Sequence, residues 1–273
     1  MPIGSASPWS DLERPPLSAE RLRRALVDHG GWRRLDVVPT TGSTNTDLVQ
    51  AARRGEPAGL VLLAEEQTGG RGRLDRSWQA PPRSSLLMSV LLRPTPEPST
   101  WPVLPLVVGT AVVEAVRAVA YVPVSLKWPN DVMADGRKLG GILVQLVEGA
   151  VVVGIGLNVS TRVDELPVPT ATSIALCGGQ IDRESLAKEV LRALRQRYDA
   201  WSRAQGASAS VLPAYREVCD TIGRRVRVEL PAGTVVVGTA TGVDDDGRLL
   251  VASDAGEQRA FTVGDVVHVR AED

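Results

Sequence analysis

The stretch Gly70-Arg71-Gly72-Arg73-Leu74-Asp75-Arg76-Ser77-Trp78 points most directly to the fold of this chain. The apolar, β-prone residues 59–65 and 85–93 flank it, so we expect a loop between two strands. Glycine lets a backbone approach a ligand closely, and guanidinium groups bind anions through charge-assisted hydrogen bonds. A solvated basic turn is the simpler interpretation. Three arginines, a closing tryptophan and the preceding Glu65-Glu66-Gln67 favour a binding site for a carboxylate, a phosphate or both.

Four further pieces stand in a fixed order around this loop. They are Ser43-Thr44-Asn45 before it, and Lys127-Trp128-Pro129-Asn130-Asp131, Lys138-Leu139-Gly140-Gly141-Ile142-Leu143-Val144 and Gly154-Ile155-Gly156-Leu157-Asn158 after it. In order and spacing, the five pieces resemble those of biotin protein ligases. The resemblance is strong over residues 35–160 and weaker elsewhere. It depends on the ordered set, because no single piece is specific.

The composition is that of an ordinary globular protein. The chain has 273 residues, 43% hydrophobic and 23% charged, enough for one large domain and one small domain. The formal net charge of −1 argues against a protein that coats nucleic acid. Cys177 and Cys219 have no other ligand at metal-binding spacing, which indicates buried thiols in a reducing, cytoplasmic compartment. No signal-peptide pattern begins the chain and Gly, Pro or charge interrupts the apolar stretches, so we expect no membrane partner.

Caps and apolar periodicity predict the elements of the first 223 residues. Residues 1–16, with four prolines, are expected to form a flexible N-terminal segment. The expected elements are a helix over 19–29 capped by Ser18, a helix from the Ser43 cap to Gly55, an apolar helix over 103–120, strands over 122–127, 139–147 and 150–157 joined by turns at Asp135-Gly136 and Glu148-Gly149, an amphipathic helix from the Asp182 cap to about Ala204, and a helix over 208–221.

At Gly223 the pattern changes to short alternating runs. Residues 225–230 alternate with period two, and three further β-prone runs follow, separated by Gly-containing turns. Such a series of short strands predicts a small barrel. We therefore expect a catalytic domain that binds biotin and ATP over 17–223 and a barrel over 224–273.

The family resemblance implies the same division and names the folds. It implies an α+β fold with a mixed β-sheet and helices, similar to class II aminoacyl-tRNA synthetases and of the biotin/lipoate ligase type, followed by an SH3-like β-barrel. The sequence contains no Gly-x-x-x-x-Gly-Lys-Ser/Thr run, and Gly154-Ile155-Gly156 continues to Val159 where a dinucleotide fingerprint needs glycine. ATP is therefore expected to bind on a different scaffold.

The resemblance assigns a biotin site to several of these pieces. A helix start at Ser43 offers a hydroxyl and free N–H groups to the ureido oxygen of biotin, although a simple helix cap also explains these residues. Gly154 and Gly156 remove bulk where a flat ring can stack, although strand packing explains each glycine nearly as well. The biotin-binding residues implied by the resemblance are Ser43, Thr44, Asn45, Gln67, Gly70, Arg71, Gly72, Arg73, Lys138, Gly154 and Gly156.

Positive charge dominates the expected ATP side of the site. Lys127 and Lys138 are expected before and after one turn, where both can face a phosphate; solvated strand-end lysines are the alternative. The proline-fixed turn offers oxygens of Asn130 and Asp131 to Mg²⁺ or to ribose. The catalytic residues implied are Lys138, Arg73, Arg71 and Lys127, and those for ATP or adenylate are Arg71, Arg73, Trp78, Asn130, Asp131, Lys138, Gly141 and Asn158.

One position departs from the family pattern. Asp75 stands where the family usually has glycine, so the backbone path of the loop is expected to differ there. We expect its carboxylate to pair with Arg73 or Arg76 before a ligand arrives.

The resemblance implies an ATP-dependent ligase. Biotin is activated as biotinyl-5′-AMP, with Mg²⁺, and passes to a lysine of the biotin carboxyl carrier domain of an acyl-CoA carboxylase. A lipoate or octanoate ligase is one alternative, which the polar residues Ser43, Thr44, Asn45 and Gln67 disfavour. A biotin-sensing repressor is another, but the stretch before Ser43 predicts only one short helix, so we expect a monofunctional enzyme without direct DNA binding. The resemblance is compatible with a homodimer.

Overall fold

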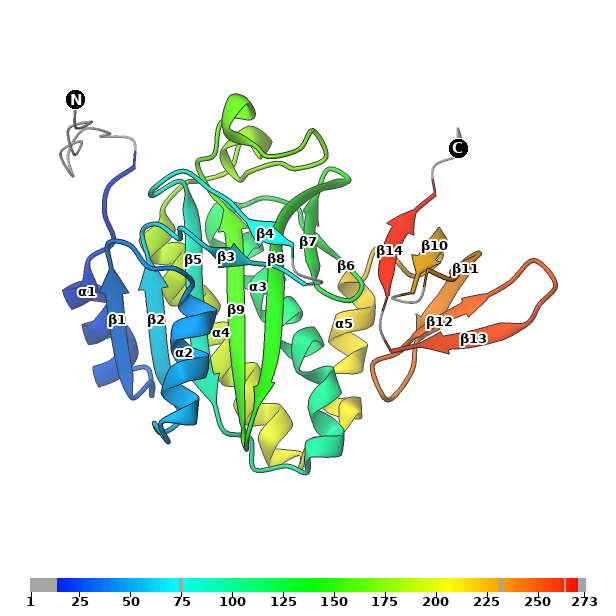
Figure 1. Ribbon diagram of the computed structural model, residues 1–273, viewed down its shortest axis with the longest axis horizontal. Helices are drawn as coiled ribbons and strands as arrows, with labels where there is room; N and C mark the ends of the chain where they lie inside the picture. The colour runs from blue at the N-terminus through cyan, green and yellow to red at the C-terminus, as the bar shows by residue number, and fades with distance from the viewer. Residues whose placement is uncertain (1–13, 74–75, 231–232, 263, 270–273) are drawn as a thin grey trace.

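The computed structural model describes residues 14–73, 76–230, 233–262 and 264–269. A seven-stranded sheet in the order β1-β2-β5-β9-β8-β7-β6 forms the larger part, and a five-stranded sheet in the order β13-β12-β11-β10-β14 forms the smaller part (Figure 1). The strands of the large sheet are β1 (Arg34–Val38), β2 (Leu60–Ala64), β5 (Ser85–Leu92), β6 (Ser125–Lys127), β7 (Asp131–Ala134), β8 (Arg137–Val147) and β9 (Ala150–Asn158). Only β1 and β2 run parallel, which confirms the expected mixed sheet.

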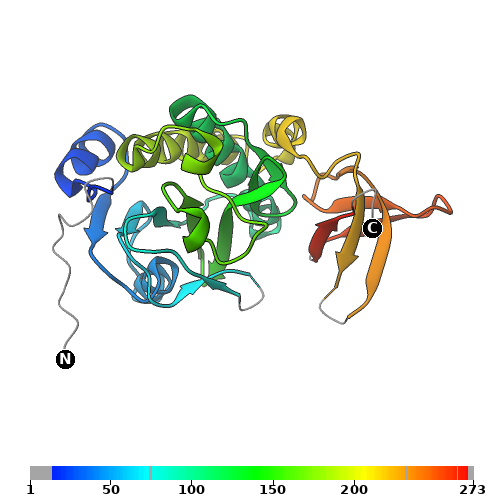
Figure 2. The ribbon, with the colours of Figure 1, turned by 90° about the horizontal axis from the view of Figure 1, so that it is seen from above.

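Helices cover the two faces of the large sheet unequally (Figures 1 and 2). One face carries α1 (Ala19–Arg23), α3 (Leu104–Ala120), α4 (Arg183–Arg203) and α5 (Leu212–Val218). The other face carries α2 (Thr44–Arg53) and the small ribbon of β3 (Gly70–Arg71) and β4 (Ser77–Trp78). The main hydrophobic core lies under α3 and α4, and a smaller cluster around Leu48 lies under α2. The thinly covered face between α2 and the β3–β4 ribbon is where the candidate site lies.

Local sequence signals determine where the helices begin. The side chains of Ser18, Ser43 and Asp182 each accept hydrogen bonds from backbone N–H groups in the first turn of their helix, so all three predicted caps are confirmed. The first helix is α-helical only to Arg23 and continues as a π-helix over Arg24–Asp28. The predicted helix over 208–221 is shorter, with a 3₁₀ turn over Ser208–Ser210 before α5.

Five strands were absent from the sequence prediction, namely β1, β7, β14 and the two-residue strands β3 and β4. β7 lies between β6 and the Asp135-Gly136 turn, so that turn joins β7 to β8, and Lys127 lies one strand further away from Lys138 than expected. The barrel contains β10 (Arg225–Glu229), β11 (Val235–Val243), β12 (Leu249–Ala252), β13 (Gln258–Phe261) and also β14 (Asp265–His268). None of the missed strands has more than five residues, too few for a period-two pattern to stand out.

The segment Pro98–Ala120 is helical throughout and is long and apolar enough to span a membrane by length and composition alone. Pro105, Gly109, Glu114 and Arg117 interrupt the segment, as expected from the sequence, and the mean hydropathy of its most apolar window still reaches 1.9. Of this window, 72% is buried inside the protein, where α3 packs against α4 and the sheet. Its composition is explained by the core of this fold.

Contacts hold the end of the segment that was expected to be flexible. The Arg14 side chain is 5% exposed and forms an ion pair with Glu165, and Pro15 O accepts a hydrogen bond from Arg183. Residues 14–16 therefore belong to the packed structure, which corrects the prediction for these three residues. Residues 1–13 lie outside the described part.

Replacing Arg183 with alanine should lower the free energy of unfolding by about 3–5 kcal/mol, because it leaves a buried carboxylate without its cation. Arg183 Nη1 lies 2.7 Å from Glu65 Oε2, and the two side chains are 5% and 12% exposed. Urea denaturation measures the change. The matched control is Arg34→Ala, since Arg34 pairs with Asp36 at a side-chain exposure of 62%. We expect it to lose less than about 1 kcal/mol, and equal losses for the two variants would contradict the buried-pair explanation.

Candidate active site

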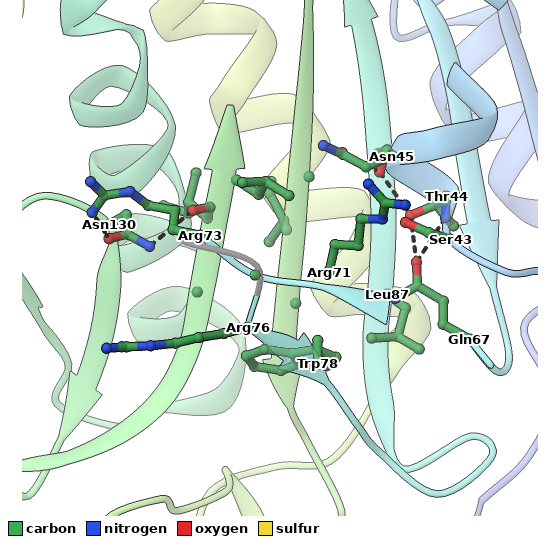
Figure 3. A pocket seen from close by; sticks show the side chains of 18 of the residues that line it. Ser43, Thr44, Asn45, Gln67, Arg71, Arg73, Arg76, Trp78, Leu87 and Asn130 are labelled. Carbon is green, nitrogen blue, oxygen red and sulfur yellow. Dashed lines mark hydrogen bonds between the residues drawn. The ribbon is translucent and has the colours of Figure 1, made fainter. Parts of the chain in front are cut away.

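The largest gathering of predicted residues lies in a cavity on the thinly covered face of the large sheet (Figure 3). One end lies at the start of α2, and the other lies at the turn between β6 and β7. The predicted residues that line it are Ser43, Thr44, Asn45, Gln67, Arg71, Gly72, Arg73, Trp78, Asn130, Asp131, Lys138, Gly141, Gly154 and Gly156. The structure thus brings residues from all five sequence pieces to one place.

The end at α2 is polar and buried. Gln67 Oε1 accepts hydrogen bonds from Thr44 N at 2.8 Å and from Thr44 Oγ1 at 2.9 Å. Thr44 Oγ1 also lies 2.7 Å from Ser89 Oγ on β5. The sequence prediction missed Ser89, a hydroxyl in the middle of a mostly apolar strand. Together these groups make a fixed polar wall at one end of the cavity.

The oxygen–oxygen contacts of this polar wall outnumber the hydroxyl hydrogens that can fill them. Asn45 Nδ2 donates to Gln145 Oε1 at 2.7 Å, which turns Asn45 Oδ1 toward Ser89 Oγ at 2.8 Å. Three oxygen–oxygen contacts then link Gln67, Thr44, Ser89 and Asn45, and the two hydroxyl groups supply only two hydrogens. The wall is therefore rich in acceptor oxygens and poor in donors, so this end is suited to a ligand that donates hydrogen bonds.

Two glycines on β9 form the floor of the cavity. A Cβ atom at Gly154 would overlap Asn45 Oδ1, and one at Gly156 would lie 2.9 Å from the Trp78 ring. The Trp78 indole therefore rests directly on the sheet. Its Nε1 atom is buried and has no hydrogen-bond partner among the described residues.

The opposite end of the cavity is cationic. Asp131 lies between two lysines, with Oδ1 at 2.6 Å from Lys138 Nζ and Oδ2 at 3.2 Å from Lys127 Nζ. Burial by itself raises the pKa of the Asp131 carboxyl, but the charges and hydrogen bonds of Lys138 and Lys127 together bring that pKa below its usual value. Asp131 is therefore ionised at neutral pH, and it holds both lysines at this end.

Arg73 adds a further cation. Its Nη1 donates to Asn130 Oδ1 at 2.9 Å, and Asn130 Nδ2 donates to Ile142 O at 3.1 Å. Burial lowers the pKa of the Arg73 guanidinium, so its charge is partly desolvated. Because its hydrogen-bond acceptor is a neutral amide, Arg73 is well suited to bind an anion in the cavity.

The barrel also contributes a residue. Asp265 on β14 lines the cavity and forms an ion pair with Arg76 of the Arg/Gly loop. Asp265 had no role in the sequence predictions, because no local signal connects positions so far apart in the chain. The expected pairing of Asp75 with Arg73 or Arg76 lies outside the described residues, but Arg76 has a carboxylate partner in the barrel.

Three predicted residues do not line the cavity. Gly70 lies opposite Trp78 in the β3–β4 ribbon, and Lys127 contacts Asp131 of the site. Asn158 is 6% exposed and donates from Nδ2 to Thr172 O at 2.9 Å, so it holds the loop after β9. This placement does not support the predicted contact between Asn158 and the adenylate.

The residues predicted to hold Mg²⁺ fit a metal poorly in this arrangement. Both Asp131 oxygens face lysines, and Asn130 Oδ1 faces Arg73. Among the described residues, no group of three His, Cys, Asp or Glu side chains is placed to bind a metal ion. A metal that accompanies ATP would have to be held mainly by the phosphate oxygens.

Comparison with known proteins matches both parts of the chain. Residues 37–161 match the "Biotin/lipoate A/B protein ligase family", and residues 221–269 match the "Biotin protein ligase C terminal domain". The biotin–[acetyl-CoA-carboxylase] ligase of Mycobacterium tuberculosis is 44% identical over 95% of this chain and 98% of its own length. The bifunctional ligase/repressor BirA of Escherichia coli is 33% identical over 80% of this chain and 69% of its own length.

Solved structures agree with these matches. A biotin protein ligase from Aquifex aeolicus, in complex with biotin and ATP, superimposes with a TM-score of 0.75 at 27% identity. The match covers 88% of this chain and all of the other. Both the large sheet and the barrel therefore have counterparts in solved structures.

Proposed function

The chain belongs to the biotin protein ligase family, and on this premise we propose that it is an ATP-dependent ligase that joins biotin to a carrier protein. The observation that carries the proposal is the cavity with a polar, hydrogen-poor wall at one end and cations at the other. A cyclic urea brings two N–H donors to the polar wall. A carboxylate and a phosphate need the positive charges. Biotin and ATP together match both ends.

In the first step, a carboxylate oxygen of biotin attacks the α-phosphorus of ATP. The new O–P bond forms as the bond to pyrophosphate breaks, and biotinyl-5′-AMP results. Arg71, Arg73 and Lys138 line the cavity and neutralise the negative charge that gathers at the α-phosphate. Asp131 keeps Lys138 and Lys127 apart from each other and aimed at the same region. Mg²⁺ is carried with the ATP phosphates.

In the second step, the ε-amine of a carrier lysine attacks the acyl carbon. The new C–N bond forms, the bond to AMP breaks, and the amine loses a proton. We propose the biotin carboxyl carrier domain of an acyl-CoA carboxylase as the acceptor, because a relative is named for acetyl-CoA carboxylase. Catalysis depends on positioning and charge neutralisation, and this chain supplies no covalent nucleophile to the proposed mechanism.

The same premise supports the division into a catalytic domain over 17–223 and a barrel over 224–273. Between α5 and β10 the chain leaves the larger part of the protein and enters the five-stranded sheet, which supports a boundary near Gly223. We propose a cytoplasmic location, where carboxylases and ATP are available.

Biotin-dependent ATP–pyrophosphate exchange tests the first step. We expect exchange with biotin and none with lipoate, because the dithiolane ring of lipoate has no N–H donor for the polar wall. Transfer to an apo carrier domain, with its acceptor lysine changed to arginine as control, tests the second step. Exchange supported equally by lipoate or octanoate would favour the alternative acyl ligase.

A further inference from the structure

A single turn holds three of the cations at the site. Asn130 binds Arg73, and Asp131 binds Lys127 and Lys138. Any shift of the turn Trp128–Asp131 therefore moves the anion-binding groups together. What holds this turn in place determines the geometry of the cationic end.

The turn is held from outside the large sheet. At Trp128 strand β6 has ended, and the Trp128 backbone N–H donates to Thr221 Oγ1 at 2.9 Å. The Trp128 indole donates to Gly247 O of the barrel at 3.0 Å. Thr221 is fully buried and lies between α5 and β10, and Trp128 is 1% exposed. A buried backbone donor without a partner is costly, so the Thr221 hydroxyl specifies the position of this turn.

The barrel in turn holds the hydroxyl. Thr221 Oγ1 lies 3.1 Å from His268 Nε2 on β14, the barrel strand nearest the large sheet (Figures 1 and 2). Burial, together with the charges of Lys127 and Arg224 and against those of Asp220 and Asp131, lowers the pKa of His268 to about 4. The ring is therefore neutral at pH 7. It can hold Thr221 without placing another positive charge beside Lys127.

We propose that Thr221 is a positioning residue for adenylate formation, and that His268 fixes its hydroxyl from the barrel. This inference rests on the proposed function. It gives the barrel a route to the cations of the site that is separate from the ion pair between Asp265 and Arg76. A threonine that served only to fill the core would tolerate valine, which has nearly the same shape.

Thr221→Val removes the hydroxyl and keeps the shape, so it tests the proposal directly. We expect the kcat of biotin-dependent ATP–pyrophosphate exchange to fall roughly 10-fold or more, as for loss of a buried hydrogen bond. The Kd for biotin should stay within about twofold of wild type, because the polar wall is at the other end of the cavity. Thr221→Ser restores the hydroxyl and should recover most of kcat.

The matched control is Thr239→Val, the same change at an exposed barrel position, which should keep the wild-type kcat. His268→Phe provides a second test that leaves Thr221 intact and should lower kcat in the same direction. If near-ultraviolet circular dichroism shows that Thr221→Val does not fold, the kcat of His268→Phe tests the inference in its place.

A wild-type kcat for a folded Thr221→Val variant, or an equal loss for the serine and valine variants, would overturn the inference. If Thr221→Val does not fold, a wild-type kcat for His268→Phe would overturn it. Failure of the wild-type protein to catalyse exchange would instead overturn the proposed function.

Discussion

Replacing Lys138 with alanine is expected to slow biotin-dependent ATP–pyrophosphate exchange about 10²–10³-fold, the usual loss when one charge-stabilising donor is removed from a transition state. Two effects combine here. The variant loses a cation that lines the cavity, and it leaves Asp131 beside the phosphates with only Lys127 to neutralise it. The remaining carboxylate then repels the substrate. Rates from a pyrophosphate exchange assay, with ATP and biotin each varied, measure the loss.

The control is Arg137→Ala, which removes an exposed cation at the neighbouring position of β8. It should keep the wild-type exchange rate. The Lys138 side chain is 38% exposed, so its replacement should leave the fold intact, which thermal unfolding can verify. An exchange rate within a few-fold of wild type for Lys138→Ala would show that the cationic end is not where the phosphate reacts.

Replacing Gly154 with alanine is expected to weaken biotin binding roughly 10- to 100-fold, the range that corresponds to overpacking of a filled site. Gly154 lies opposite Ser89 in the β5–β9 ladder, and its added methyl group would overlap Asn45 Oδ1. The Asn45 amide must then move, which breaks its hydrogen bonds to Ser89 and Gln145. The polar wall loses its fixed orientation. Titration calorimetry with biotin measures the change in Kd.

Gly242→Ala is the matched control, because an added Cβ at this barrel position would meet nothing within 4 Å. Its biotin Kd should equal that of wild type. The affinity of the Gly154→Ala variant for ATP should change much less than its affinity for biotin, because Lys138 and Arg73 lie at the opposite end. Unchanged biotin binding by Gly154→Ala would show that the ring of biotin does not lie against this wall.

The two ends of the cavity differ in how well they can be predicted from the sequence. At the cationic end, arginines and lysines stand among glycines and next to a proline turn, so their chemistry is visible in short motifs. At the polar end, Ser43-Thr44-Asn45 was visible as a helix start, while Ser89 and Gln145 were hidden in apolar strands. Single polar residues in buried strands are a usable signal only once the strand faces are known.

Local chemistry determined the caps at Ser43 and Asp182, the mixed content of helices and strands, and the anion-binding character of the Arg/Gly loop. These depend on interactions within a few residues, which a sequence displays directly. The tertiary structure alone decided that Asp265 meets Arg76, that Thr221 and His268 hold the Trp128 turn, and that Asn158 faces Thr172. Two of these contacts join residues 189 and 93 positions apart, and the other two, 47 and 14 positions apart, still join separate segments. Because packing of whole elements sets such distances, no local pattern of residues carries them.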